Sequence, residues 1–229
     1  MRALVGLAAL AVIASGLVIA LSDIPFGAPD SQVGPHYNQN GREDTGAVNM
    51  VTSVVVGYRA FDTLGEITVL FVAAVGLGAL LHRSSRSDGR DDREPASMVL
   101  TTGCRFLFPL ILLFGAYIFM HGHLTPGGGF QGGAVIASAF LLVYLGCRGR
   151  RIGRGWSSTV ESLGGLVFVG LGLAGLAAAG HWFLSAFLPK GTPYQLFSAG
   201  IIPLIYVAVG LKVGVELTGV IDRLMEDTQ

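Results

Sequence analysis

Residues 105–145 read RFLFPLILLFGAYIFMHGHLTPGGGFQGGAVIASAFLLVYL, two apolar runs joined by a glycine-rich loop. The loop, HGHLTPGGGFQGG over residues 121–133, has six glycines among its thirteen residues. Each flanking run approaches the roughly 20 apolar residues that an α-helix needs to cross the hydrocarbon core of a bilayer. We therefore expect two membrane helices connected by a tight reversal.

The composition of the whole chain is that of a polytopic membrane protein. Of its 229 residues, 52% are hydrophobic and 13% are charged, whereas soluble domains carry about 25% charged residues. The net charge is zero, so nothing in it indicates a nucleic-acid partner. We predict an all-α, multi-pass protein of the cell (plasma) membrane with about six transmembrane helices. These are residues 3–21, 61–81, 106–120, 130–147, 159–179 and 199–220.

The first apolar stretch has an alternative interpretation. Arg2 precedes an apolar run, as in a secretory signal peptide. The run is long for a signal peptide, however, and the following SDIPFGAPD offers no clear A-x-A cleavage site. We expect a retained helix, with cleavage as the open alternative.

The basic residues indicate how the chain is oriented. One side of the predicted topology holds only Arg42, Arg59 and Lys190 in its connections. The other side holds many more: Arg2, Arg83, Arg86, Arg90, Arg93, Arg105, Arg148, Arg150, Arg151, Arg154 and Arg223. Because connections rich in lysine and arginine stay in the cytoplasm, we expect both termini there. The glycine loop then lies at the outer face.

A polar stretch divides the chain into two predicted units. HRSSRSDGRDDREPAS, residues 82–97, mixes both charges and ends near a proline, as a solvated linker does. It separates a two-helix unit, residues 1–81, from a four-helix unit, residues 98–229. Before the second helix, GAVNMVTSVVVGYRA is either a short interfacial helix or a partly buried segment, and its periodicity does not decide between them.

The glycine loop contains two patterns that would suggest a cofactor in a soluble enzyme. Gly127, Gly129 and Gly132 satisfy G-x-G-x-x-G, but a dinucleotide site needs a preceding strand and an acid about 20 residues on. His121 and His123 offer two imidazoles, whereas a zinc site needs three or four ligands. We therefore expect no catalytic residue, metal or other cofactor. The histidines should satisfy backbone groups or face water, and a role in proton handling stays open.

A structural role explains the loop better. A proline and glycines allow a tight reversal, and Gly129 and Gly133 have the G-x-x-x-G spacing that lets membrane helices approach closely. We expect the loop to pack against another chain or helix. The residues of this packing loop are Pro126, Gly127, Gly128, Gly129, Gly132 and Gly133.

Charged side chains inside the predicted spans are candidates for function. A charge at the centre of a membrane helix costs at least about 2.5–3.5 kcal/mol on insertion scales, so it is rarely kept without a role. Asp62 and Glu66 lie one turn apart, and Asp62 could cap its helix while Glu66 lies deeper. The structural alternative pairs Glu66 with Arg59 or with a neighbouring protein chain.

Two further positions carry charges near the predicted inner face. Lys212 and Glu216 are also one turn apart, near the inner end of the sixth helix, where a local ion pair is the structural alternative. Glu161 starts the fifth predicted helix, where the helix dipole favours an acid. Together with the loop histidines, the ion or proton pathway candidates are Glu66, Asp62, Lys212, Glu216, Glu161, His121 and His123.

Residues 105–145, and above all PGGGFQGG, resemble the signature of the MnhB family. This family supplies the B subunit of Mrp-type multisubunit cation/proton antiporters and a related subunit of membrane-bound hydrogenases. The resemblance continues through VESLGGLVFVGLG to SAGIIPLIYVAVGLKVGVEL and covers roughly residues 97–217. The last segment departs from the pattern, which would have more polar residues at Ile205 and Tyr206.

The N-terminal unit has a resemblance of its own. VVVGYRAFDTLGEITVLFVAAVGL, residues 54–77, is similar to a segment of the hydrogenase E-type protein that also ends the large A subunit of Mrp antiporters. Glu66 matches the glutamate of its F-D-T-L-G-E motif. That family commonly has V-D-F-R before F-D-T, whereas Gly57 and Tyr58 stand here. No role of the missing aspartate carries over.

Together the resemblances imply a non-catalytic integral-membrane subunit of a multisubunit monovalent cation (Na⁺)/proton antiporter. Its partners would be other membrane subunits, the lipid bilayer, the cation and protons. The alternative is a membrane-arm subunit of a redox-driven ion pump such as a membrane-bound hydrogenase. A third interpretation is a membrane metalloenzyme built on His121 and His123.

Overall fold

The computed structural model describes residues 2–22, 32–82, 97–147, 154–179, 183 and 187–227. All regular structure within these residues is helical, which confirms the all-α prediction. Six of the helices are long and apolar enough to cross a membrane. They are α1 (Arg2–Ser22), α4 (Ala60–His82), α5 (Met98–Met120), α6 (Gly129–Gly146), α7 (Arg154–Ala179) and α8 (Ile202–Asp227).

The chain separates into two compact units, Met1–His36 and Tyr37–Gln229. The first unit contains α1 and the beginning of α2 (Val33–Thr45). None of the Leu4–Ser22 span is buried, and its apolar side chains are exposed on every side of the helix. A helix that is apolar all round suits a lipid environment.

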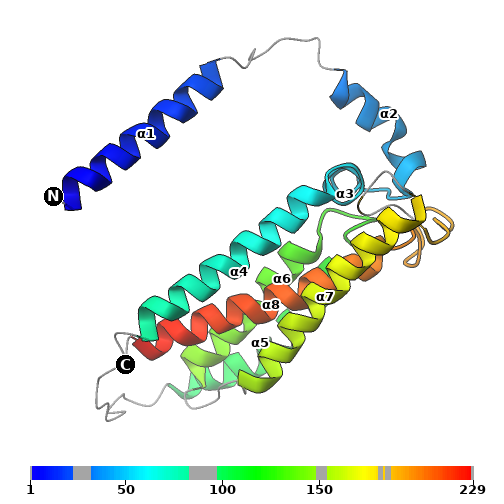
Figure 1. Cartoon of the computed structure of the whole chain (residues 1–229). Helices are drawn as coiled ribbons and strands as arrows, with labels where there is room; N and C mark the ends of the chain where they lie inside the picture. The colour runs from blue at the N-terminus through cyan, green and yellow to red at the C-terminus, as the bar shows by residue number, and fades with distance from the viewer. Residues whose placement is uncertain are drawn as a thin grey trace. The chain divides into compact units, whose positions relative to one another are not determined.

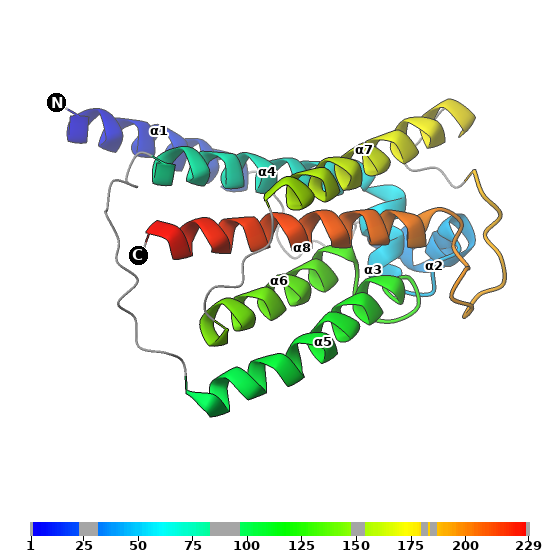
Figure 2. The ribbon, with the colours of Figure 1, turned by 90° about the horizontal axis from the view of Figure 1, so that it is seen from below.

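Helix α8 is the centre of the second unit. It contacts α4, α5, α6 and α7, and α6 lies between α5 and α8 (Figures 1 and 2). More than half of its span is buried, against 11% for α4 and 17% for α5. The core joins α8 to α4, α7 and the segment before α4, through Ile201, Ile205, Val209, Val213, Ile67, Phe168 and Val56. The outer helices therefore present much of their apolar surface away from the other helices of this unit.

Three helices extend beyond their predicted bounds by more than one residue: α5, α8 and α7, which begins at Arg154 rather than at residue 159. The third span begins at Met98 rather than at residue 106, because Ser97 caps it by accepting a hydrogen bond from the Leu100 amide at 3.2 Å. The sixth begins at Ile202 because Ala199 and Gly200 have φ angles of 64° and 60°, which are not helical. It continues to Asp227, seven residues beyond the predicted end at residue 220.

The segment before α4 is more helical than its sequence suggests. The polar α2 has no apolar periodicity and was not predicted. It is followed by α3 (Met50–Thr52) and by η1 (Ser53–Tyr58), a short π-helix. Thr52, Ser53 and Val56 are buried, so this segment is both helical and partly buried. The predicted linker lies outside the described residues except for His82 and Ser97, as do the arginines from residues 148 to 151.

Candidate functional site

The glycines of the packing loop lie at the start of α6, between two helices of the same chain. A Cβ atom on Gly129 would lie 2.7 Å from Val209 Cβ of α8, and one on Gly133 would lie 2.8 Å from the Gly210 carbonyl oxygen. A Cβ on Gly132 would lie 2.7 Å from a backbone oxygen of α5. The G-x-x-x-G pair thus faces α8, and the third glycine faces α5.

The loop before α6 is equally crowded. A Cβ on Gly127 would lie 2.8 Å from the Ile118 carbonyl oxygen, so the reversal after Pro126 brings the chain back against α5. Gly128 precedes α6 with a φ of 149°, a conformation that residues with a Cβ avoid. These positions need glycine for close approach and backbone geometry.

Part of the loop is covered by the segment before α4. The Asn49 side chain donates to the carbonyl oxygens of Gly122 and Thr125, at 2.8 and 2.9 Å. The Asn49 amide donates to the His123 carbonyl oxygen at 3.0 Å. The segment before α4 therefore satisfies backbone groups that the glycine loop leaves open.

Tyr206 extends this network to α8. Its hydroxyl donates to Thr52 Oγ1 at 2.7 Å, and the Thr52 hydroxyl donates to the Gly122 carbonyl oxygen at 2.7 Å. All three groups are buried. Tyr206 is one of the two residues at which the sequence departs from the MnhB pattern, and its hydroxyl group supplies a polar contact there.

The two loop histidines contact different backbone carbonyls. His121 Nδ1 lies 3.1 Å from the Tyr117 oxygen, and its ring stacks on Tyr117. His123 is fully buried, with Nε2 3.4 Å from the Gln195 oxygen. Burial lowers the pKa of His123 below its ordinary value of 6.5. Within the described part of the chain, no three His, Cys, Asp or Glu side chains lie close enough to hold a metal ion.

The acids at the start of α4 are arranged differently from the expectation. Asp62 lies inside the first turn of α4, and so is not its N-cap residue. It pairs with Arg59 at 2.5 Å, and both side chains are more than half exposed. Glu66 is also exposed, and among the described residues it forms no ion pair. Arg59 therefore pairs with Asp62, and Glu66 is exposed on the surface of the unit Tyr37–Gln229.

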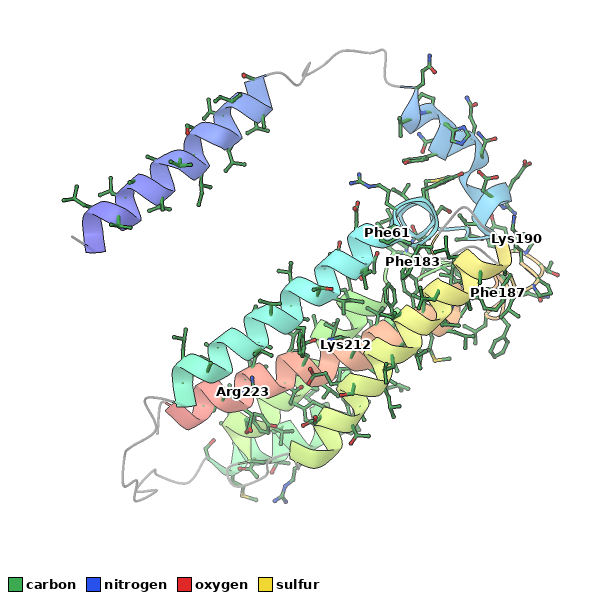
Figure 3. The ribbon with its side chains drawn as sticks, in the orientation of Figure 1. Phe61, Phe183, Phe187, Lys190, Lys212 and Arg223 are labelled. Carbon is green, nitrogen blue, oxygen red and sulfur yellow. The ribbon has the colours of Figure 1, made fainter. Side chains whose placement is uncertain are left out.

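Lys212 and Glu216 form a buried ion pair. Lys212 Nζ lies 2.6 Å from Glu216 Oε2, and the side chains are 8% and 1% exposed. Because α8 extends to Asp227, the pair lies in its middle turns rather than near the inner end as predicted. Figure 3 shows Lys212 in this part of α8. Gly164 of α7, where a Cβ would lie 2.8 Å from the Ala208 oxygen, lets α7 approach the pair closely.

Glu161 lies near this pair but does not start its helix. It is two turns into α7, since α7 begins at Arg154, and the field of a helix terminus acts mainly within the first turn. Glu161 and Glu216 instead line one cavity, together with Asp222 and Arg223. The last two residues were not predicted, although residues 212, 216, 219 and 223 repeat at the spacing of one helix face.

Comparison with protein families gives two matches along the chain. Residues 99–219 match the family model described as a domain related to the MnhB subunit of Na⁺/H⁺ antiporter. Residues 2–91 match the MbhE model, which describes the E subunit of MBH. Both agree with the two resemblances inferred from the sequence.

Two solved structures share the fold. A chain in the membrane-bound sulfane sulfur reductase, an archaeal respiratory membrane complex, is 46% identical with a TM-score of 0.74, and 97% of each chain is covered. A chain in the Mrp complex from Dietzia sp. DQ12-45-1b is 30% identical with a TM-score of 0.70. There the match covers 97% of this chain but 26% of the other.

A curated relative is similar over almost the whole length. An uncharacterized protein of Methanocaldococcus jannaschii is 31% identical, with 86% of this chain and 87% of the relative covered. Both solved relatives are parts of multisubunit membrane complexes. This multi-pass membrane chain therefore belongs to the family of proteins related to the MnhB subunit of Na⁺/H⁺ antiporters.

Proposed function

We propose that the chain is a non-catalytic integral-membrane subunit of an Mrp-type multisubunit antiporter, which exchanges a monovalent cation such as Na⁺ for protons. In this proposal the chain has two parts. Residues 1–81 form a unit like the hydrogenase E-type protein, and residues 98–229 form a unit like the MnhB subunit. Family membership and the likeness to a chain of an Mrp complex support this proposal.

The observation that carries the proposal is the exposure of Glu66. It lies within the Ala60–Leu81 span, and its side chain is exposed on the surface of the unit Tyr37–Gln229. A carboxylate facing lipid is strongly unfavourable, so such a group normally faces protein or water. A partner subunit would cover it, and a carboxyl group at a subunit interface within the membrane can carry a proton.

The test is antiport by the assembled complex carrying Glu66→Gln. Glutamine keeps the shape and hydrogen bonding of the side chain but cannot release a proton, so we expect antiport to be abolished or strongly reduced. Proton flux against cation concentration is measured in vesicles, and assembly is checked by co-purification of the partner subunits. Normal flux in a fully assembled complex would reduce Glu66 to a structural group.

Two further variants sharpen this experiment. Glu66→Asp keeps an acid and should retain part of the flux, with a shifted pH optimum. Asp62→Asn is the matched control, because Asp62 lies one turn away and already pairs with Arg59. It should reduce flux less than Glu66→Gln. Equal losses in both variants would assign the effect to the local structure of α4.

A second candidate is a membrane-arm subunit of a redox-driven ion pump. The likeness to a chain of an archaeal respiratory membrane complex favours it, because that match covers 97% of both chains. Purification of the native complex separates the candidates. Co-purifying iron–sulfur subunits would favour the redox-driven pump, and antiporter subunits alone would favour the first proposal.

A further inference from the structure

Four helices enclose a polar cavity beside the C-terminal half of α8. Its volume is about 240 Å³, and its walls come from α4, α6, α7 and α8. That is room for several water molecules, since one water takes up about 30 Å³ in the liquid. The ionisable residues in its walls are Glu161, Glu216, Asp222 and Arg223, with Tyr144 contributed by α6. A cavity with this lining suits water rather than an apolar ligand.

Glu216 has one oxygen without a partner at this cavity. Its Oε2 accepts a hydrogen bond from Lys212 Nζ at 2.6 Å, whereas its Oε1 is buried and accepts none from the described residues. The residue is 2% exposed. A buried carboxylate oxygen requires a donor, and the polar cavity that Glu216 lines can supply a water molecule to it after a small rotation of the side chain.

Beyond the Lys212–Glu216 pair, toward the N-terminal end of α8, the surroundings become apolar. From Ile202 to Leu211, Tyr206 is the one polar side chain of α8, and Ile205 and Val209 are buried in the core. On its other side, Lys212 lies over the Phe71 ring, with Nζ 5.5 Å from the ring centroid. Phe71 and Lys212 line an apolar groove between α4 and α7. Glu161 lines both this groove and the cavity, but the groove is mainly apolar, so we expect water to reach Glu216 through the polar cavity.

Arg223 lines the cavity on the side of the C-terminal end of α8, where it joins α8 to α4. Its guanidinium donates to the Ala74 carbonyl oxygen of α4 at 2.6 Å, across from α8 (Figure 3). Gly78 permits this, because a Cβ there would lie 2.6 Å from Arg223 Nη1. The charged groups that surround Glu216 are thus Lys212 and Arg223, with Glu161 and Asp222. The helices α4 and α6 contribute no charged side chain to the described cavity wall.

We propose that this cavity is a water-filled half-channel, open toward the C-terminal end of α8, in which Glu216 exchanges protons with water. A hydronium ion donates a proton to the Glu216 carboxylate, and the same proton later returns to cavity water. Lys212 keeps its ammonium protons throughout and loses its carboxylate partner while Glu216 is neutral. The inference deepens the proposed function and rests on it, because it adds a proton site to the proposed antiporter chain.

Infrared difference spectra of the purified complex test the proton exchange. Acidification should produce the C=O stretch of a protonated carboxyl group, and Glu216→Gln should remove one such band. Asp62→Asn is the control and should leave the Glu216 band in place, because Asp62 lies far along α4 from the cavity residues Ala74 and Val75. A spectrum that Glu216→Gln leaves unchanged over the whole accessible pH range would overturn the proposal.

Cysteine accessibility tests the half-channel. In a complex without the native Cys104 and Cys147, Thr218→Cys places a thiol at the cavity, and Val209→Cys places one beyond the ion pair. Both positions are 3% exposed, so they are matched in burial. A small cationic methanethiosulfonate added at the side of the α8 C-terminus should modify the first thiol and spare the second. An unmodified Thr218→Cys, or equal modification of both, would contradict a half-channel that ends at Lys212.

Both measurements report on the cavity itself and require no antiport. Loss of the proposed antiport function would appear in the flux assay of the assembled complex. Failure of the half-channel would appear in the spectra and in thiol modification. The two failures are therefore distinguishable.

Discussion

The buried imidazole of His123 makes the loop region sensitive to acid. Burial lowers its pKa below 6.5, and the neighbouring His121 adds to the lowering. The folded chain then binds a proton at this site less readily than the unfolded chain, so protonation favours unfolding. Stability should fall as the pH drops below about 6.5, within the range where histidine titrates. Stability does not change through this group at higher pH.

Thermal unfolding of the purified complex measures this effect. We expect a lower Tm at about pH 5.5 than at about pH 7.5, and a smaller difference in His123→Gln. His121→Gln is the control, because that ring lies on Tyr117 and is less buried. An acid-induced loss of the same size in wild type and in His123→Gln would assign the sensitivity to other groups.

Single residues were predictable from the sequence where their partners are close in the chain. Lys212 and Glu216 are four residues apart on one helix, so their ion pair follows from helix geometry. Arg59 pairs with Asp62 rather than with Glu66. This pairing depends on where α4 begins, and the sequence does not specify that position. The bond between Tyr206 and Thr52 joins residues 154 positions apart, and only the packing of α8 against the segment before α4 brings them together.

At the scale of elements, the packing of α6 on α8 depends on small residues. A Cβ on Gly133 would lie 2.8 Å from the Gly210 oxygen and 2.9 Å from the Gly214 nitrogen. These are backbone atoms of α8, which cannot move without shifting the helix. Gly133→Ala should therefore destabilise the chain by about 1–3 kcal/mol, the usual cost of overpacking. Chemical denaturation of the purified chain in mild detergent measures it.

Gly103→Ala is the matched control for this variant. It also lies within a membrane helix, but nothing lies within 4 Å of its added Cβ. Because alanine favours helix by up to about 1 kcal/mol over glycine, this variant should be neutral or more stable. Equal responses of the two variants would mean that close packing at Gly133 contributes little.

Hydropathy located the six spans but not all of their ends. Helix α5 begins at Met98 because a serine cap and polar residues such as Thr101 can extend a helix beyond its apolar core. Helix α2 has no apolar face to reveal it in the sequence. Asp222 and Arg223 were not predicted as cavity residues because α7 and α8 meet at an angle and register that periodicity does not specify.

At the scale of the whole molecule, the predicted orientation rests on the arginine distribution. Thr125 lies exposed in the glycine loop, and Ser97 lies exposed at the opposite end of α5. With the native cysteines removed, Thr125→Cys should react with an impermeant maleimide added to intact cells. Ser97→Cys should react only after permeabilisation. The reverse pattern would place the glycine loop in the cytoplasm and invert the topology.

The exposed surfaces of α4 and α5 bear on whether the chain can transport ions alone. Only 11% of the α4 span and 17% of the α5 span are buried, and Glu66 faces outward from α4. Such surfaces require covering protein if a carboxyl group is to remain within the membrane. In the described part of the chain, the polar cavity beside α8 gives way beyond Lys212 to the apolar core residues Val209 and Ile205. The chain reconstituted alone into vesicles should therefore show no cation-dependent proton movement, whereas the assembled complex should show it under the same gradients. Robust antiport by the isolated chain, with its purity established by mass spectrometry, would show that it is a carrier in its own right.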